Sequence, residues 1–406
     1  MLKSKFYRIF LASALTSIAL LPVSSTVARS DANPRENQDS VLMNDVHFHL
    51  DNYIQEGIPI GEFLKLMGDK VGRVAIFGIP LQQKWDYFVD GDRSPDYYLL
   101  SDTELYYYSF VDAIVATEYL KLSPEQRKRF DPMITGFNPT DMYATDHIKR
   151  VLKIYPGVFS GIGEFTIHKE FVSPKVAGHT ASLKNEALNR VFSLAGDIGL
   201  AVLIHCDIDT NRPAPGPRPA YLDDLKTLFR SHPKTTIIWA HTGLGRTISP
   251  RPEHLQYLAE ILSDPAYNNV VFDISWDEVA KYVIKDPETT RAWANLLNKY
   301  PDRFLFGSDA VAPKTEAAYL KTYQDYAPLW KALDPKTSYQ IRIGNYERIF
   351  DTARQKVRSW EQKQVSLDSR PALSALTLAE TPSFRAAFGG SCSSPLIAGC
   401  FIETPR

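Results

Sequence analysis

Apolar residues between positions 44 and 310 gather in short continuous runs that rarely alternate with polar residues. Such runs are typical of parallel strands that are covered on both faces. The pattern predicts eight strands, at Asp45–His49, Arg73–Pro80, Pro132–Phe137, Val158–Glu164, Ala201–His205, Thr236–His241, Val270–Ile274 and Phe304–Ser308.

The segments between these strands carry the spacing of amphipathic helices. Leu183–Ile198 has apolar residues three or four positions apart and ends before Gly199, and Leu222–Arg230 and His254–Leu262 follow the same pattern. Strand and helix therefore alternate, which predicts the α/β class with a parallel sheet. Eight strands, in a sequence without the glycine fingerprint of dinucleotide binding, favour a closed (β/α)8 TIM barrel over an open doubly wound sheet.

Two long segments fall outside the repeating pattern. Residues 81–130, after the second strand, are rich in aromatic residues, mainly Tyr, and this aromatic insertion would either overhang the barrel mouth as a wall or lid or pack on itself. After the barrel, at 44–352, we predict a terminal helix at Thr352–Gln364 and a weakly structured tail, which together occupy 353–406.

The first 28 residues have the three parts of a secretory signal: a basic start, the apolar stretch Ile9–Val23, and small residues up to Ala28. About 15 apolar residues interrupted by Pro22 are too few for a stable membrane span. We therefore predict a signal peptide at 1–28, a flexible lead-in at 29–43, and a periplasmic or secreted protein.

Composition and charge narrow the class of partner. The chain has 406 residues, 44% hydrophobic and 23% charged, and a formal net charge of −1. These values are ordinary for a globular protein and argue against nucleic acid as a partner, so a small molecule is the expected one. Cys392 and Cys400 would be able to pair in an oxidising compartment, and Cys206 is predicted to be a buried thiol that faces the helical shell. No oligomeric state is predicted.

Four of the predicted strands end on, or directly before, a residue that can bind a metal ion, and the first strand carries two more. The six residues are His47, His49, Glu164, His205, His241 and Asp309. Imidazoles and carboxylates are the usual ligands of zinc, iron and manganese in proteins. Because the C-terminal strand ends of a barrel meet at one mouth, we expect these side chains to surround a metal centre there.

The six residues support this hypothesis in different ways. His47 and His49 are two apart on a strand, so both face one side, and Asp45 lies one layer deeper, where it would orient an imidazole. A carboxylate inside a barrel, such as Glu164, is costly to bury without a cation. Two histidines at equivalent strand ends of consecutive units favour ligation over the ordinary role of a core histidine.

The motifs around these residues resemble those of the amidohydrolase superfamily, in particular its amidohydrolase-related branch. The resemblance extends from Asp45 to about Phe350 and rests on Asp45-x-His47-x-His49, Gly163-Glu164, Ile204-His205, Ala240-His241-Thr242-Gly243, Gly307-Ser308-Asp309 and Gly344-Asn345-x-x-Arg348-Ile349-Phe350. It implies a TIM-barrel fold and a metal-dependent hydrolase.

The resemblance also implies how the ligands are divided. The two histidines of the first strand would hold the more buried metal, with Asp309 as a further ligand, and His205 and His241 would hold the more exposed metal. Glu164 stands where many two-metal members carry a carboxylated lysine, and it would bridge the ions. Two Zn²⁺ ions are expected, with Mn²⁺ or Fe²⁺ as alternatives, and a one-metal site also stays open.

The implied activity is hydrolysis of a lactone, ester, amide or phosphoester of a small organic molecule by a metal-activated water, with Asp309 as the general base. The alternatives are a one-metal decarboxylase of the same fold and a non-catalytic exported binding protein. The complete ligand set argues against the binding protein, and Glu164 favours the hydrolase because a one-metal lyase needs no bridging carboxylate.

Four further residues are candidates for contact with the substrate. Arg212, Arg218 and Arg246 follow the fifth and sixth strands and would be able to pair with an anionic group, although each has the ordinary alternative of a solvated surface arginine. His168 follows Glu164 closely enough to act as a proton shuttle, or it is an ordinary loop histidine.

The signal sequence gives a direct test. We predict that the mature protein begins near Arg29, because the small-residue site ends at Ala28. Sequencing the N-terminus of protein recovered from expressing cells measures this. An intact Met1 on a cytoplasmic protein would contradict export.

Overall fold

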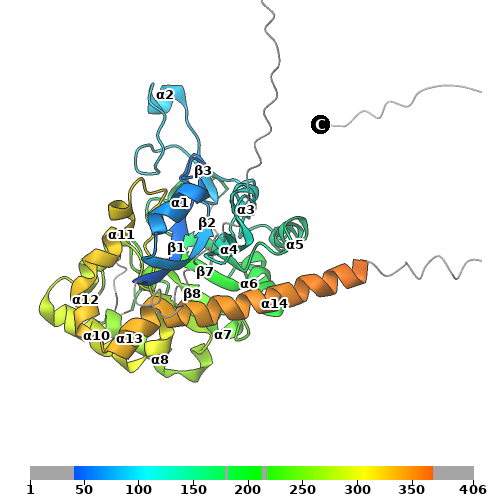
Figure 1. The fold of residues 1–406 in the computed structure, drawn as a ribbon. Coiled ribbons are helices and arrows are strands. Elements are labelled where there is room, and N and C mark those ends of the chain that lie inside the picture. Colours follow the sequence, from blue (N-terminus) through cyan, green and yellow to red (C-terminus); the bar gives the residue numbers. More distant parts are fainter. Residues whose placement is uncertain (1–40, 179–181, 213–215, 217, 369–406) are drawn as a thin grey trace, which may run out of the picture.

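The computed structural model describes residues 41–178, 182–212, 216 and 218–368, and they form a parallel barrel with helices around it (Figure 1). The main sheet has nine strands, β1 (Met43–His49), β2 (Val71–Phe77), β5 (Phe130–Ile134), β6 (Gly161–His168), β7 (Ala201–Cys206), β8 (Ile237–Trp239), β9 (Val270–Asp273), β10 (Phe304–Leu305) and β11 (Ala310–Val311). Their order is β10-β9-β8-β7-β6-β5-β2-β1-β11. The predicted strands are confirmed, with shifted ends.

The sheet closes through residues 304–311. Strand β10 pairs with β9, β11 pairs with β1, and both pairings are parallel, so one segment supplies the eighth position of the barrel. Between its two halves, the amide of Val46 donates to the carbonyl of Phe306 (3.2 Å), and the amide of Asp309 donates to the carbonyl of His47 (2.8 Å). The barrel is therefore closed although its eighth strand is interrupted.

Asp45 stabilises the interruption. Its carboxylate accepts hydrogen bonds from the amides of His47 (3.0 Å) and Ser308 (2.8 Å) and from the hydroxyls of Ser308 (2.6 Å) and Tyr319 (2.9 Å). The prediction that Asp45 orients an imidazole is therefore wrong. The amide of Ser308 lies between the two paired halves, and the carboxylate satisfies it there.

The helices surround the sheet. They are α1 (Ile60–Met67), α2 (Tyr87–Asp90), α3 (Val111–Leu120), α4 (Pro124–Arg127), α5 (Ala144–Ile154), α6 (Glu186–Ile198), α7 (Leu222–Ser231), α8 (His254–Ser263), α9 (Asp277–Val283), α10 (Pro287–Lys299), α11 (Glu316–Asp325), α12 (Ala327–Ala332), α13 (Pro335–Tyr339) and α14 (Asn345–Asp368). The prediction of a helix that ends before Gly199 is confirmed. Helix α6 begins after Asn185, whose side chain accepts a hydrogen bond from the amide of Ala187, and it stops at Gly199, which has φ 91°.

Alternation along the strands divides the core into two layers. Outward-facing strand residues pack against the helices, and the buried thiol of Cys206 belongs to this outer layer, as predicted. Ala201 and Leu203 of β7 face the barrel interior, where they join a smaller cluster that includes Tyr346 and Phe350 of α14. Helix α14 therefore plugs one end of the barrel, and the next inward-facing position of β7, His205, lies toward the other end.

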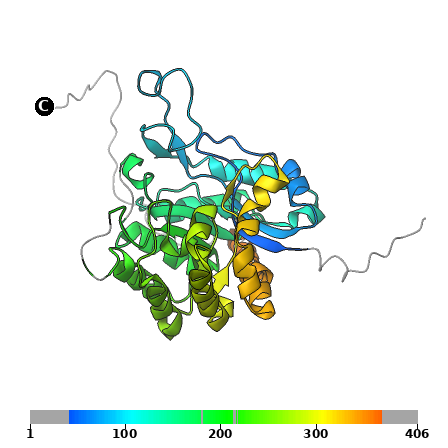
Figure 2. The same ribbon diagram turned by 90° about the vertical axis from the view of Figure 1, so that its left-hand side faces the viewer.

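The aromatic insertion lies over that other end (Figures 1 and 2). Its strands β3 (Leu81–Gln83) and β4 (Leu105–Tyr107) form an antiparallel pair. Tyr98 of the insertion packs in a small cluster with Tyr53 from the loop after β1 and Val172 from the loop after β6. The insertion is thus a wall shared by three loops, whereas α2 projects from the body and Phe88 at its tip is 94% exposed.

The C-terminal helix is longer than expected. It begins at Asn345 rather than Thr352 and runs to Asp368, across the end of the barrel away from the insertion. The predicted signal peptide, most of the lead-in, the tail, Cys392 and Cys400 lie outside the described residues. None of the described helices is both long and apolar enough to cross a membrane.

Candidate metal centre

The structure brings all six sequence-predicted residues together at the insertion end of the barrel. For each imidazole, the shortest contact with Glu164 or Asp309 joins His205 Nδ1 to Glu164 Oε1 (2.7 Å), His49 Nε2 to Asp309 Oδ1 (3.1 Å), His47 Nε2 to Asp309 Oδ1 (3.3 Å) and His241 Nε2 to Glu164 Oε1 (3.7 Å). Each of the four histidines is at most 1% exposed. Six residues on or next to five different strands therefore form one buried polar cluster.

Two features of the backbone, the lengths of β6 and β8 and two residues with positive φ angles, place these side chains. Strand β6 continues past Glu164 to His168, and β8 stops at Trp239, two residues before His241. His241 (φ 58°) and Asp309 (φ 52°) both adopt left-handed backbone. This conformation is unfavourable outside glycine and collects at functional sites, where surrounding contacts hold it.

Gly163 is required beside Glu164. It has φ 122°, and a Cβ added there would lie 2.2 Å from the carbonyl oxygen of Leu203 on β7. The close approach of β6 to β7 is what brings Glu164 to His205. The Gly-Glu motif therefore has a steric basis.

A second set of side chains orients the imidazoles. Asp273 Oδ2 lies 2.9 Å from His47 Nδ1, and Ser275 Oγ lies 3.2 Å from the same nitrogen and 3.1 Å from His241 Nδ1. Asp207 Oδ1 lies 3.1 Å from His205 Nε2. When a ring is neutral, a partner that accepts from one of its nitrogens leaves the other nitrogen as an acceptor toward the cluster.

Sequence reasoning missed these orienting residues. Asp273 is near the end of a correctly predicted strand, and Asp207 is two positions after His205, so the signal was a carboxylate close to the mouth. The signal does not tell which imidazole each carboxylate meets, because that depends on the register of neighbouring strands.

The cluster fits a divalent metal ion. His47 Nε2 and His241 Nε2 are buried without a hydrogen-bond partner, and both face carboxylate oxygens 3.3–3.8 Å away. Two ligands about 2.1 Å from one tetrahedral ion lie roughly 3.4 Å apart. The contacts therefore suit ligands of a common ion better than direct hydrogen bonds.

The donor atoms form overlapping groups. One is His47, His49 and Glu164, another is Glu164, His205 and His241, and a third is His47, His241 and Asp309. Within each group the atoms lie within 4.8 Å of one another. His47, His241 and Glu164 each belong to two of these groups, and of the three only Glu164 has two oxygens with which to bridge two ions.

The electrostatics of the cluster favour a positive charge at its centre. Burial alone would raise the pKa of Glu164, but Lys169 and His205 outweigh it and hold that pKa well below its ordinary range. Burial would lower the pKa of His47, yet Asp309 and Glu164 raise it well above its usual value. Burial and Lys169 lower the pKa of His205 to about 3, so this ring stays neutral and able to ligate.

Lys169 is a cation beside the cluster that sequence reasoning missed. Its side chain is 9% exposed, and its Nζ lies 3.8 Å from Glu164 Oε2 and 5.8 Å from the centre of the Trp276 ring. Burial would lower its pKa, but Glu164 outweighs burial and keeps the pKa well above its ordinary value. Lys169 therefore carries its charge at the barrel mouth.

Of the four predicted substrate contacts, the structure brings only Arg246 near the cluster. Its guanidinium carbon lies 5.5 Å from the centre of the Trp276 ring, and that ring lies 5.0 Å from the ring of His241. Its terminal nitrogens donate to Glu278 (2.6 Å) and to the hydroxyl of Tyr97 (3.1 Å).

The other three lie elsewhere. Arg218 pairs with Glu260 and Asp223 on the outer surface, and Arg212 is exposed. The ring of His168 stacks on Tyr221 at 3.8 Å, and burial lowers its pKa to about 4. After a register shift in β6, His168 pairs with Cys206 of the outer layer and its ring contacts Tyr221 rather than the cluster, so the structure gives no support to a proton shuttle there.

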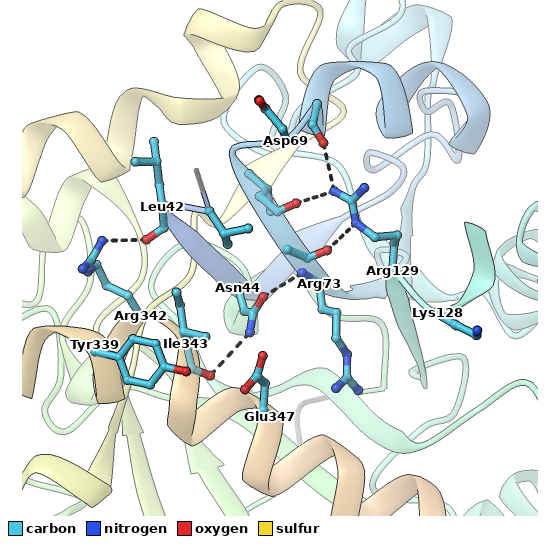
Figure 3. A pocket seen from close by; sticks show the side chains of 14 residues that line it. Leu42, Asn44, Asp69, Arg73, Lys128, Arg129, Tyr339, Arg342, Ile343 and Glu347 are labelled. Carbon is cyan, nitrogen blue, oxygen red and sulfur yellow. Dashed lines mark hydrogen bonds between the residues drawn. The ribbon is translucent and has the colours of Figure 1, made fainter. Parts of the chain in front are cut away.

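A cavity of about 900 Å³ lies away from the cluster, near the start of β1 and β2 (Figure 3). Two of its polar side chains are already engaged: Asn44 Oδ1 accepts from the amide of Arg73 (2.7 Å), and Arg342 Nη1 donates to the carbonyl of Leu42 (2.8 Å). The N-terminal end of barrel strands usually serves stability, so we do not place the active site there.

The amidohydrolase family model matches residues 166–352. This match contains His205, His241 and Asp309 and begins just after Glu164. The match confirms, for this part of the chain, the resemblance to the amidohydrolase family that the motifs predict. The family indicates a metal-dependent, hydrolase-type enzyme.

Solved structures also resemble the chain. An amidohydrolase from Burkholderia multivorans with bound zinc is 12% identical, with 77% of this chain and 99% of that chain covered and a TM-score of 0.47. A putative 2-pyrone-4,6-dicarboxylic acid hydrolase from Pseudomonas putida is 12% identical (77% and 98% covered, TM-score 0.47). A 2,6-dihydroxybenzoate decarboxylase from Rhizobium is 13% identical (77% and 99% covered, TM-score 0.44). The search of curated proteins found no significant match.

Asp273 provides a test of the orienting contacts. Asp273→Asn keeps the shape of the side chain but removes the charge that faces His47 Nδ1. We expect zinc affinity to fall by about 10–100-fold, as measured by competition with a chelator. The control is Asp277→Asn, which changes a carboxylate that faces Lys321 at the surface and should leave zinc affinity unchanged. Equal affinities in the two variants would show that Asp273 does not support a metal ligand.

Proposed function

We propose that the protein is a hydrolase that uses two divalent metal ions, with Zn²⁺ as the expected metal and Mn²⁺ or Fe²⁺ as alternatives. Its substrate would be a lactone, ester, amide or phosphoester of a small organic molecule. The observation that carries this proposal is the position of Glu164. Its Oε1 faces His205 (2.7 Å) and His47 (3.6 Å), and its Oε2 faces His49 (3.5 Å), so one carboxylate meets both halves of the cluster.

The residues divide between two positions. The two histidines of β1 and Asp309 would hold the first ion, His205 and His241 the second, and Glu164 would bridge them. A divalent metal bound here supplies an acidified water and polarises the carbonyl or phosphoryl group of the substrate. The orienting contacts from Asp273, Ser275 and Asp207 keep the imidazoles in place during the reaction.

Asp309 is the proposed general base. Burial would raise its pKa, but His47 and neighbouring imidazoles hold that pKa well below its ordinary range, so the carboxylate is ionised at neutral pH. Its Oδ1 faces the histidines of β1, and Oδ2 lies 3.8 Å from His241 Nε2, between the two halves of the cluster. The carboxylate takes a proton from the attacking water and passes it to the oxygen or nitrogen of the leaving group as the bond to that atom breaks.

Two further parts of the proposal rest on sequence. The segment 1–28 supports export to the periplasm or beyond the cell, and the near-neutral charge together with the aromatic wall supports a small-molecule substrate.

Asp309→Asn separates base catalysis from metal binding. Because the amide keeps one oxygen in place, metal content should fall only in part, whereas turnover should fall by about 10²–10⁴-fold. His47→Ala and His49→Ala should lose metal and activity together. Metal analysis and rates would be measured on a panel of lactones, aryl esters and phosphoesters, with zinc and with manganese. The control is Asp302→Asn, which changes an exposed carboxylate just before β10 and outside the cluster.

Three results would count against the proposal. An Asp309→Asn enzyme with full metal content and the parent rate would exclude Asp309 as the base. One metal per chain together with release of carbon dioxide from an aromatic acid would favour the decarboxylase. Full metal occupancy with no turnover of any panel member, and tight binding of one of them, would favour the binding protein.

A further inference from the structure

The side chain of Lys169 is largely buried at the mouth, at 9% exposed, and most of the bonding capacity of its ammonium group is unused. Apart from the 3.8 Å contact with Glu164 Oε2, it makes no hydrogen bond to any residue that the structure describes. An ammonium has three donors, and a buried charge is costly unless they are satisfied. The side chain is therefore suited to a ligand that brings acceptor atoms.

The backbone around Lys169 is fixed. The amide of Lys169 donates to Ser173 Oγ (2.8 Å), and the amide of Glu170 donates to Asp207 Oδ2 (2.9 Å). Lys175 Nζ donates to the carbonyl of Tyr98 (2.7 Å), which ties this loop to the insertion. The backbone that carries Lys169 is thus fixed in advance of binding, which lowers the entropic cost of ordering this loop around a ligand.

Arg246 and Trp276 form the rest of the surface beside Lys169. Arg246 Nε is buried without a hydrogen-bond partner, while the two terminal nitrogens are engaged by Glu278 and Tyr97. The indole of Trp276 contacts both cations and also the ring of His241. The indole ring therefore lies beside the cluster of proposed metal ligands and beside two cationic groups. Each of these groups has at least one unused hydrogen-bond donor.

We propose that Lys169, with Arg246 as a second and weaker contact, forms a carboxylate-binding subsite, and that the substrate is a small planar or cyclic carboxylate lying against Trp276. This specifies the substrate class of the proposed hydrolase and rests on that function. A singly charged carboxylate fits this subsite, because its two oxygens would accept from the unused ammonium donors of Lys169 and from Arg246 Nε.

The position of Lys169 also constrains the substrate. Because Nζ lies 3.8 Å from a carboxylate oxygen of Glu164, an anion bound to it is next to the reacting centre. The substrate carboxylate is therefore attached close to the bond that is hydrolysed. In the competing explanation Lys169 is only the counter-ion of Glu164, and its loss would then affect metal binding or stability without any effect on ligand charge preference.

The test compares a charged probe with its neutral counterpart. Benzoate and benzamide would be titrated calorimetrically into the zinc-loaded full chain and its Lys169→Met, Lys169→Arg and Arg246→Met variants. The control is Lys128→Met, which changes a 68% exposed lysine at the opposite end of the barrel. Zinc content and thermal unfolding would be measured for every variant.

The proposal predicts that the parent binds benzoate at least about tenfold more tightly than benzamide. Lys169→Met should remove this preference at full zinc content while the affinity for benzamide stays the same. Lys169→Arg should keep part of the preference, Arg246→Met should reduce it less than Lys169→Met, and Lys128→Met should match the parent.

Two outcomes would overturn the proposal: a parent without preference for benzoate, or a preference that survives in folded Lys169→Met. If Lys169→Met does not fold, a preference that is unchanged in both Lys169→Arg and Arg246→Met overturns it as well. Repeating the titration on chelator-treated protein separates this claim from the hydrolase. If the parent protein does not bind zinc at all, the metal mechanism is refuted. The proposed subsite is independent of this result, because it predicts that the Lys169-dependent preference for benzoate persists in the metal-free protein.

Discussion

The arrangement of the mouth depends on the burial of two carboxylates, Glu164 and Asp309, inside a barrel. Such groups are stable only when cations or strong hydrogen bonds offset the loss of water. Four imidazoles and one ammonium converge on them, and the pKa of His47 is raised in response. A divalent metal is the natural partner of this donor set, and the orienting residues Asp273 and Asp207 hold ring nitrogens ready for it.

The rest of the barrel makes this concentration of charge possible. Helix α14 plugs the opposite end with apolar side chains, so the interior changes from an apolar layer to a polar one along its length. The interruption of the eighth strand lets the backbone at Asp309 turn inward, and Asp45 satisfies the amide that the interruption exposes. The insertion and the loop after β6 then narrow the mouth around Lys169 and Trp276.

Sequence reasoning predicted the strands, the barrel and the six clustered residues, because parallel buried strands are continuous apolar runs and their ends meet at one mouth. It could not predict contacts that depend on the exact length or register of a strand. Strand β6 continues past Glu164 with register shifts against β7, and there His168 lies on the outer side against Tyr221 while Lys169 lies at the mouth. Arg218 and Arg246 looked alike in sequence, and only the packing of their loops separates a surface ion pair from a contact with Trp276. The role of the six residues as metal ligands stays a prediction.

Anomalous diffraction at the zinc edge, from crystals of the zinc-loaded protein, tests this role most directly. The account predicts two peaks roughly 3.5–4 Å apart, with a carboxylate oxygen of Glu164 next to each. One peak would lie beside His47 and His49 and the other beside His205 and His241. A zinc-loaded crystal without a peak among these residues, or with peaks that Glu164 does not contact, would contradict it.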